Sequence, residues 1–170
     1  MPLGSDYSRQ DCSLARALEV VGERWTPLIL RDCFLGVRRF SDLQAHLDIS
    51  KAVLSTRLDA LVAEGLLERS AGGHPEYTLT DEALGLWPAL YALTQWGERR
   101  TTPGAPRRIF RHVGCGDLAL DGRCSVCGAT PAPGDLEIRP GPGADPTLRD
   151  DPVSVALREP HRLLTPLTLR

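Results

Sequence analysis

The chain has 170 residues and a mass of 18.5 kDa, a size typical of one ordinary domain or of one small domain with an appendage. Its 20 basic and 22 acidic side chains give a formal net charge of −2, which excludes a globally basic nucleic-acid coat and an acidic solvating tail. Glycine and proline are concentrated after Thr101, so the composition predicts a structured first part of the chain and a loop-rich remainder.

Four helices are predicted in the first part of the chain, because apolar residues recur there at spacings of three and four. Gly22 and Gly36 end the first two helices. The third and fourth helices are separated by a tight turn, and Ser50 is a suitable N-cap for the fourth. The four helices are expected over residues 12–21, 25–35, 40–47 and 51–64.

A β-hairpin and a long fifth helix are expected next. Two strand-like runs, residues 66–69 and 76–79, flank a glycine-rich tip and predict the hairpin. The fifth helix should run over residues 81–98, with a kink at Pro88. This helix is apolar on more than one side, whereas a lone surface helix needs one apolar stripe. The excess indicates either a dimer interface or burial under the C-terminal region. The residues concerned are Trp87, Leu90, Tyr91, Leu93 and Trp96.

Two short helices joined by a three-residue turn and followed by a hairpin are typical of a winged helix-turn-helix. The predicted fold is therefore mainly α with a small β-hairpin wing. A helical bundle solvated on one side has the same periodicity, and the order of the elements favours the winged helix. The apolar residues expected to face inward from the fourth helix are Val53, Leu54, Leu58, Leu61 and Val62.

The opposite face of the fourth helix carries small and polar side chains, which let a helix lie close to base edges in the major groove. Arg38 and Arg39 flank the third helix, where it would cross the DNA backbone. Arg57 borders the core and is expected to reach a phosphate or to pair with Asp42. The DNA-binding candidates are Arg38, Arg39, Ser50, Lys51, Ser55, Thr56, Arg57 and His74.

Several short blocks of the sequence resemble the HxlR-type transcriptional regulators in the same order. They lie between residues 11 and 100 and include Cys12–Thr26, Gly36–Leu43, Ile49–Leu58, Gly65–Arg69 and Glu76–Thr80. The resemblance implies a winged-helix transcription factor related to the MarR group, which binds double-stranded DNA as a homodimer. It also implies that the first and last helices of the domain form the dimer interface.

A second motif combines one histidine with three cysteines. His112 and Cys115, like Cys124 and Cys127, are separated by two residues, a gap that lets both side chains point at one ion. Four such ligands close the coordination shell, so we expect a structural zinc in a zinc-ribbon-like hairpin with a turn at Asp121–Gly122. The alternatives are a Cys124/Cys127 redox pair and loose thiols in a disordered tail.

The composition and motifs divide the chain into five segments. We expect a disordered N-terminus, a winged helix-turn-helix domain for DNA binding and dimerisation, a basic linker, a zinc-binding hairpin and a largely disordered tail. The linker either lies along phosphates or is merely solvated, and five arginines between Arg99 and Arg111 make it basic. The boundaries are residues 1–10, 11–100, 101–110, 111–140 and 141–170.

The remaining cysteines and the tryptophans bear on regulation. Cys12 matches the position of the reactive thiol in HxlR-type redox sensors, and a helix N-terminus stabilises a thiolate, although a buried structural role is commoner for a lone cysteine. Cys33 is expected in the core. A small-molecule inducer would bind between the first and fifth helices, near Trp25, Trp87 and Trp96.

We therefore expect a DNA-binding regulator, and not an enzyme, that responds to a small molecule or an oxidant. A metal-dependent enzyme or a protein-interaction module built on the Cys/His cluster is the alternative. The N-terminus lacks a basic region followed by an apolar run, and the longest uncharged stretch is too short to span a bilayer. A cytoplasmic protein without a membrane partner is therefore expected.

Overall fold

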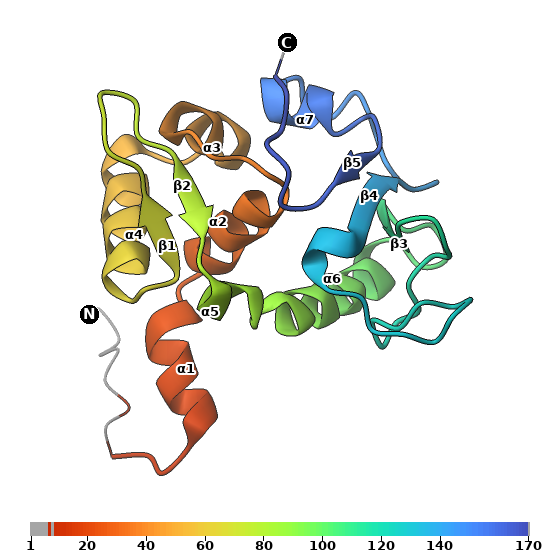
Figure 1. The fold of residues 1–170 in the computed structure, drawn as a ribbon, viewed down its shortest axis with the longest axis horizontal. Helices are drawn as coiled ribbons and strands as arrows, with labels where there is room; N and C mark the ends of the chain where they lie inside the picture. Colours follow the sequence, from red (N-terminus) through yellow and green to blue (C-terminus); the bar gives the residue numbers. More distant parts are fainter. Residues whose placement is uncertain (1–6, 8, 170) are drawn as a thin grey trace.

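The computed structural model describes residue 7 and residues 9–169, and the expected disorder of residues 1–10 falls largely outside this part. Two lobes are connected along one edge by α5 and α6, and α3 meets α7 along the opposite edge (Figure 1). The elements are α1 (Ser13–Val21), α2 (Trp25–Phe34), α3 (Phe40–Leu47), α4 (Lys51–Ala63), β1 (Leu67–Arg69), β2 (Tyr77–Leu79), α5 (Asp81–Leu84), α6 (Trp87–Thr101), β3 (Arg108–His112), η1 (Pro133–Asp135), β4 (Leu136–Pro140), α7 (Pro152–Ala156) and β5 (His161–Arg162).

The first lobe is a winged helix-turn-helix, which confirms the predicted fold. Helices α3 and α4 pack on α2, and Leu43, Leu54 and Leu58 are fully buried between them. The hydroxyl oxygen of Ser50 accepts a hydrogen bond from the Val53 amide over 3.3 Å, so Ser50 caps α4 as expected. The inward orientation predicted for Val53 differs from the structure, where this side chain is 38% exposed because it lies at the edge of the buried stripe.

The wing is an antiparallel hairpin in which Leu67 pairs with Leu79 and Arg69 with Tyr77. Residue Arg39, just before α3, forms a further bridge to Glu76, and the Tyr77 amide donates to the Arg38 carbonyl over 2.8 Å. The base of the wing is therefore fixed to the start of the first helix of the motif.

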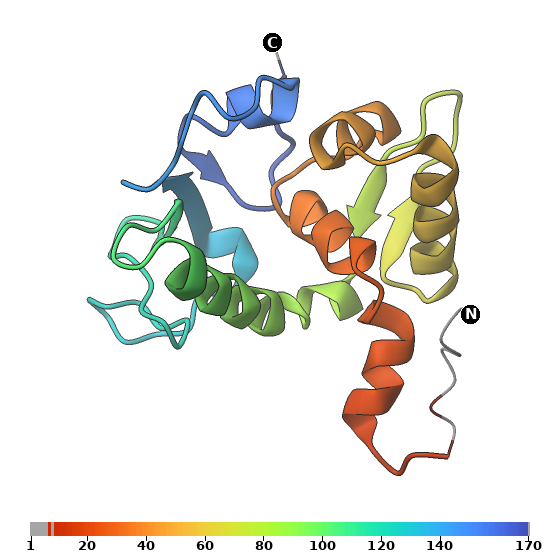
Figure 2. The ribbon, with the colours of Figure 1, turned by 180° about the vertical axis from the view of Figure 1, so that it is seen from behind.

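Helix α1 projects from the first lobe (Figures 1 and 2). Leu14 and Leu18 are 66% and 43% exposed, whereas Ala15 is buried. The helix is amphipathic as predicted, but within the described residues most of its apolar face has no partner.

The expected fifth helix is two helices. Helix α5 ends at Leu84, and α6 begins at Trp87 with Pro88 in its first turn, where the missing amide costs nothing. The chain is therefore broken before the proline, and the prediction of one kinked helix over residues 81–98 is wrong. Trp87 and Tyr91 are buried against Phe110 of the second lobe.

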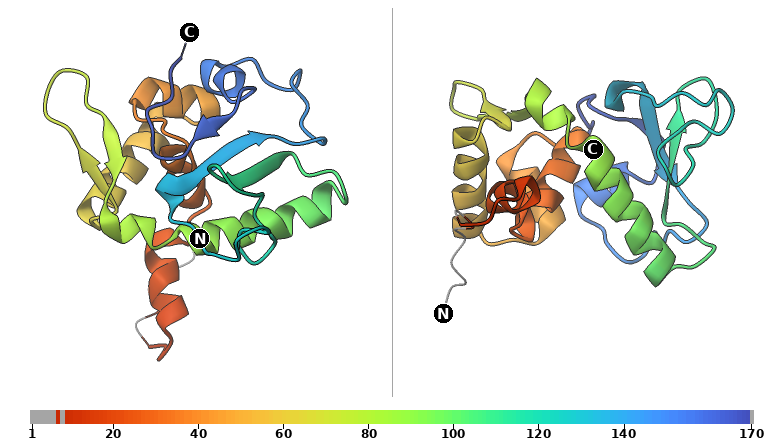
Figure 3. Two further views of the ribbon diagram at one scale, coloured as in Figure 1. Left: turned by 45° about the vertical axis from the view of Figure 1, so that its right-hand side comes forward. Right: turned by 90° about the horizontal axis from the view of Figure 1, so that it is seen from below.

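The second lobe contains a three-stranded antiparallel sheet in the order β3-β4-β5 (Figure 3). Strand β3 begins at Arg108, inside the segment expected to be a linker. Strand β5, at His161–Arg162, comes from the segment expected to be disordered. The sheet therefore extends beyond the predicted hairpin of residues 111–140 on both sides.

The last part of the chain is folded, so the expectation of a largely disordered tail over residues 141–170 differs from the structure. Val153, Leu157 and Leu163 are at most 2% exposed and belong to the common core. The Leu164 amide donates to the Phe34 carbonyl, and the Leu167 amide to the Gly36 carbonyl. The tail thus lies along the connection between α2 and α3.

No helix in the described part of the chain is both long enough and apolar enough to cross a membrane.

Candidate DNA-binding face and metal centre

The outward face of α4 presents the side chains expected to read DNA. Lys51, Ser55 and Thr56 are all exposed, and α4 lies at the outer edge of the first lobe (Figure 1). The Thr56 hydroxyl donates to the Ala52 carbonyl over 2.9 Å. Among residues 7 and 9–169, neither Lys51 nor Ser55 has a side-chain hydrogen bond or ion pair, so both groups are available to a ligand.

The arginines around α3 and α4 are more strongly engaged than the sequence suggested. Arg57 pairs with Glu23 in the turn before α2, with Nε 3.3 Å from Oε2, rather than with Asp42. Arg39 lies 3.7 Å from Glu76 and is exposed, whereas Arg38 is half-buried and donates to the Leu164 carbonyl over 3.3 Å. Arg39 is therefore the freer of the two guanidinium groups before α3.

His74 lies at the exposed tip of the wing, on the same side of the first lobe as α4 (Figures 1 and 3). The basic stretch that follows α6 lies in the other lobe, where three of its arginines form hydrogen bonds or ion pairs with groups of the same chain. Arg108 donates to the Leu157 carbonyl over 2.6 Å, and Arg107 and Arg111 are each within 4 Å of a carboxylate, at Glu98 and Asp117. These contacts favour a structural role for this stretch over a phosphate-binding one.

The four predicted metal ligands come together in one cluster. One side-chain donor atom from each of His112, Cys115, Cys124 and Cys127 lies within 4.8 Å of all the others. Two tight turns present them, closed by the Cys115 amide on the His112 carbonyl and by the Gly128 amide on the Cys124 carbonyl, both at 2.9 Å.

A glycine allows the two turns of the cluster to approach each other. A Cβ on Gly116 would lie 2.5 Å from Cγ2 of Val126, closer than real side chains come. Gly122, with φ +82°, forms the expected turn between the two halves, where its amide donates to the Ala119 carbonyl. The predicted hairpin therefore has the geometry needed to bring both halves to one point.

The spacing of the donor atoms fits a tetrahedral ion. With zinc–sulfur bonds of about 2.3 Å and zinc–nitrogen bonds of about 2.0 Å, the edges of the tetrahedron are about 3.5–3.8 Å long. The Cys115 and Cys124 sulfurs are 3.6 Å apart, and the Cys127 sulfur is 3.5 Å from Nδ1 of His112. The donor set and its dimensions match a site with one histidine and three cysteines.

The protein environment also favours one thiolate in the cluster. Backbone amides of Cys127 and Val126 donate toward the Cys124 sulfur and lower its pKa to about 5. The pKa of Cys115 is raised, first because its thiol hydrogen-bonds to Cys124. Amide donors directed at a cysteine sulfur are typical of metal-binding turns, because metals bind the thiolate.

The other two cysteines lie far from this cluster in the sequence and differ in exposure. Cys12 is exposed at the N-cap of α1. Cys33 is buried in the core as expected, and burial raises the pKa of its thiol. An oxidant in solvent therefore meets Cys12 and the cluster, but not Cys33.

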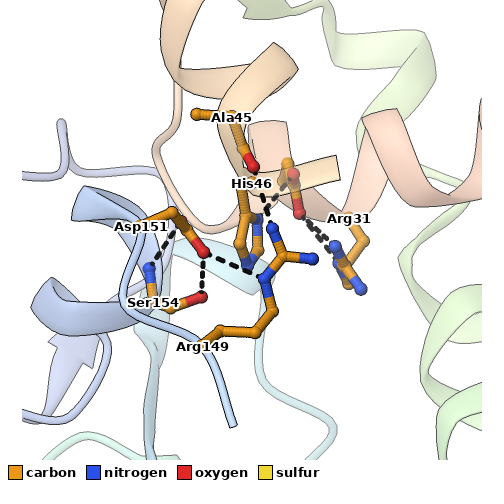
Figure 4. Close-up of polar contacts among 7 residues, drawn as sticks. Arg31, Ala45, His46, Arg149, Asp151 and Ser154 are labelled. Atoms are coloured by element: carbon orange, nitrogen blue, oxygen red, sulfur yellow. Dashed lines mark hydrogen bonds and ion pairs between the residues drawn. The ribbon is translucent and has the colours of Figure 1, made fainter. Parts of the chain in front are cut away.

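A buried carboxylate, which the sequence analysis did not single out, lies close to the contact between α3 and α7 (Figure 4). Asp32 is fully buried, with Oδ1 2.6 Å from Nη2 of Arg31 and Oδ2 2.8 Å from Nδ1 of His46. Beside it, Arg149 donates to the Ala45 carbonyl over 2.9 Å and to Asp151 over 3.0 Å. The bond from Arg149 to the Ala45 carbonyl ties the C-terminal lobe to α3, and the Asp32 bonds tie α2 to α3.

The three tryptophans do not form the expected ligand site. Trp87 packs in the core 5.2 Å from Phe34, and Trp96 is 55% exposed beside Arg100. A cavity of about 250 Å³ lies elsewhere, between the start of α3 and the C-terminal tail. Its lining includes Arg38, Arg39, Asp42, Glu76, Val153 and Leu167.

Comparison with known proteins agrees with this geometry. The model of the HxlR-like helix-turn-helix family matches residues 20–104, from within α1 to just beyond α6. The chain belongs to this family. The matched range contains the helix-turn-helix and the wing and ends before the Cys/His cluster, so this cluster of the HxlR-like chain lies outside the matched family domain.

The curated relatives of this HxlR-like chain are also regulators. An uncharacterised HTH-type transcriptional regulator of Mycobacterium tuberculosis is 44% identical over 138 residues, 77% of this chain and 87% of its own length. The regulator YvaP of Bacillus subtilis is 33% identical over 93 residues, 52% of this chain and 86% of its own length. The prediction of a transcriptional regulator rather than an enzyme is thereby confirmed.

The match to the mycobacterial regulator extends past the family domain. Because it covers 77% of a 170-residue chain, it necessarily includes the whole segment from His112 to Cys127, wherever it begins. The segment that carries the metal cluster is therefore part of what the two proteins share.

Solved structures resemble the winged-helix part of this HxlR-like chain. A candidate transcription factor shares 40% identity with a TM-score of 0.53 over 56% of this chain and 69% of its own. The redox regulator HypR in its reduced form shares 25% identity with a TM-score of 0.50 over 53% of this chain and 95% of its own. These likenesses support the winged-helix assignment made from the sequence.

Proposed function

We propose that this HxlR-like chain acts in the cytoplasm as a homodimer that binds a specific double-stranded DNA sequence, and that it responds to a small molecule or an oxidant. The proposal of DNA binding rests on the outward face of α4. Its Lys51 and Ser55 side chains are exposed and uncommitted within the described residues, on a helix held rigidly by Leu54 and Leu58. Such a face suits the major groove.

The surrounding groups divide into base-reading and backbone-contacting roles. Ser55 and Thr56 lie on the face of α4 that would meet base edges, and Lys51, after the cap Ser50, would contact a base or a phosphate. Arg39 would contact phosphate at the start of α3. Arg38 and Arg57 would contribute once their bonds to Leu164 and Glu23 are exchanged for phosphate, and His74 would reach the backbone from the wing.

The homodimer is supported by apolar surface that the single chain leaves uncovered. Leu14 and Leu18 of α1 are 66% and 43% exposed, and Leu93 and Trp96 of α6 are 59% and 55% exposed. Helices α1 and α6 lie along the same edge of the molecule (Figure 1). Several large apolar side chains on one side of a soluble protein are typical of an interface with another protein.

A structural zinc is the metal we propose for the cluster of His112, Cys115, Cys124 and Cys127. Four protein donors at tetrahedral spacing leave no open position for a substrate. When bound, the ion would neutralise thiolate charge and crosslink the two turns. The residues of the chain supply its full coordination shell.

DNA binding is tested by selecting bound fragments from a genomic library, followed by footprinting of the best fragment. We expect a protected site with two half-sites about 34–36 Å apart along the helix axis, as for other helix-turn-helix dimers. Binding without sequence preference at physiological salt would refute the proposal of a sequence-specific regulator.

The proposed homodimer and the proposed zinc are tested by two separate measurements. Light scattering at micromolar concentration should give twice the 18.5 kDa mass of the chain, and a monomer would contradict the homodimer. Elemental analysis of protein purified with a reductant and without chelator should give about one zinc per chain. A value well below one, together with full retention of folded structure, would contradict the structural zinc.

A further inference from the structure

The thiols of the metal centre are spaced for reaction with one another. The sulfur atoms of Cys115 and Cys124 are 3.6 Å apart, and formation of a disulfide bond of about 2.05 Å would draw them closer by about 1.5 Å. Cys115 is partly exposed, whereas Cys124 is buried. An oxidant can therefore reach the sulfur of Cys115 from solvent, and the sulfur of Cys124 is 3.6 Å away from it.

We propose that Cys115 and Cys124 are the oxidation site of this regulator, where a hydroperoxide converts the two thiols into a disulfide and releases the metal. The effect on DNA rests on the proposed function, whereas the thiol chemistry does not. This site is a pair of cysteines in contact with each other. Cys12 differs because no second sulfur is in contact with it among the described residues.

The reaction needs one equivalent of hydroperoxide. Cys115, which would be a thiolate as a ligand of the metal, attacks the terminal peroxide oxygen. The O–O bond breaks, and the alkoxide leaves and takes up a proton as alcohol. The sulfenic acid formed on Cys115 is then attacked by the Cys124 thiolate, which displaces hydroxide as the S–S bond forms. Two thiols and one hydroperoxide thus give one disulfide, one alcohol and one water, and two of the four metal donors are consumed.

The loop between these two cysteines is in contact with α6. The Tyr91 hydroxyl donates to the Ala119 carbonyl over 2.9 Å, and a Cβ on Gly122 would lie 3.6 Å from the Tyr91 ring. The ring of Tyr91 also meets Phe110, two residues before the ligand His112, with centroids 5.4 Å apart. A change in the loop therefore acts directly on the helix that we assign to the dimer.

This contact gives oxidation a route to the DNA-binding state. The disulfide would draw Cys115 and Cys124 together and leave His112 and Cys127 without the shared ion, so the loop of residues 116–123 would be rearranged and Tyr91 would lose its acceptor at Ala119. Helix α6 carries the exposed Leu93 and Trp96 within about one and a half turns after Tyr91. A shift of α6 would alter the spacing of the two α4 helices in a dimer, and with it the fit to two half-sites.

The test uses the full-length reduced protein with zinc bound and its selected DNA fragment. Hydrogen peroxide is added stepwise, and we expect one zinc released per disulfide, detected with a coloured chelator. Peptide mapping should find Cys115 linked to Cys124. The affinity for DNA should fall by about tenfold or more, in the range typical of allosteric coupling, and return when a dithiol reductant and zinc are added.

Variants distinguish the formation of the disulfide from its effect on DNA affinity. The Cys12→Ser variant should respond like the unchanged protein, and the Cys115→Ser variant should form no such disulfide. In Tyr91→Phe, the disulfide should still form and zinc should still leave, but the fall in DNA affinity should be smaller. Because Cys115→Ser also removes a metal ligand, mapping of the unchanged protein decides the assignment if this variant misfolds.

Three results would overturn the inference: a disulfide through Cys12 with the cluster still reduced, oxidation of Cys115 and Cys124 without any change in DNA affinity, or a peroxide response that persists in Cys115→Ser. If the reduced protein binds no DNA, the proposed function fails instead, and the mapping and zinc release still decide the chemistry of the cluster.

Discussion

Gly36 and Thr165 approach so closely that a Cβ on Gly36 would lie 1.8 Å from the Thr165 carbonyl oxygen. Gly36 ends α2 with φ +82°, and its carbonyl accepts from the Leu167 amide over 3.0 Å. A residue 129 positions later in the sequence therefore sits against the helix end that leads into the helix-turn-helix. The C-terminal tail is part of the folded motif and is not an appendage.

The Gly36→Ala substitution should therefore destabilise the protein strongly. Alanine in the left-handed conformation costs about 1–2 kcal/mol. The clash with Thr165 adds a further cost of about 1–3 kcal/mol, typical of overpacking. We expect chemical denaturation to give a loss in the free energy of unfolding of about 2–5 kcal/mol as the sum of these two effects.

Gly65 provides a matched control for this substitution. It follows α4 with φ +72°, and a Cβ at this position would meet no other atom within 4 Å, so Gly65→Ala reports backbone strain alone. Equal losses of stability in the two variants would show that the tail does not pack against Gly36 in solution.

The elements that could be predicted from the sequence are those with local signals. The α3–turn–α4 unit carries its own apolar period, a cap at Ser50 and a stop at Gly65, and its boundaries agree within a residue or two. The tail could not be predicted in this way, because Val153, Leu157 and Leu163 are ordered by partners far away in the sequence. A segment rich in proline and glycine without periodicity has the composition of a linker until those partners are known.

The candidate site shows the same distinction. The proximity of the four candidate metal ligands could be predicted because two residues between donors is a short-range constraint, and the structure brings all four together. Buried Asp32 was missed because an acidic residue between Arg31 and Cys33 carries no sign of burial in the sequence. Asp42 of the preceding helix was an expected partner of Arg57, beside a phosphate, but its actual partner Glu23 lies before α2 and is brought close only by tertiary packing.

Replacement of Lys51 by alanine should weaken DNA binding. The side chain is exposed at the first turn of α4, so the variant loses one positive charge at the proposed interface without loss of packing. If the ammonium contacts a phosphate, affinity should fall for all sequences and the salt dependence of binding should decrease by about one ion. Fluorescence anisotropy over a range of salt concentrations measures both quantities.

Arg123→Ala is the control for this measurement. Arg123 is exposed in the metal-binding loop of the other lobe and pairs with Asp121, so it changes the net charge equally. Equal weakening by both substitutions would mean that the effect arises from net charge and not from α4.

Charge introduced on α1 or α6 should separate the dimer. Leu18→Glu and Trp96→Glu each replace an apolar side chain, about half exposed in the single chain, by a carboxylate. Burial of an unpaired charge at an interface costs several kcal/mol, so the dissociation constant should rise by orders of magnitude. Sedimentation velocity would detect the monomer.

The matched control is Leu148→Glu. Leu148 is 74% exposed in the segment before α7, and its neighbour Arg149 bonds to Ala45 of α3 rather than to α1 or α6. This variant should remain a dimer. A dimer that persists in both interface variants would place the interface on another surface.

Asp32→Asn should weaken the contact between α2 and α3. The carboxylate is fully buried, and its second partner His46 is mostly buried, so the amide removes the negative charge and leaves one oxygen acceptor for Arg31 and His46 in place of two. Loss of one member of a buried ion pair costs about 3–5 kcal/mol, and we expect the lower end because Arg31 is 41% exposed and can turn to solvent. Hydrogen exchange should show faster opening of α3 than of β1 and β2. The control is Asp121→Asn, which removes the charge of an exposed pair with Arg123 and should leave stability unchanged within about 0.5 kcal/mol. If the two variants behave alike, the Asp32 cluster is not what holds α3 against α2.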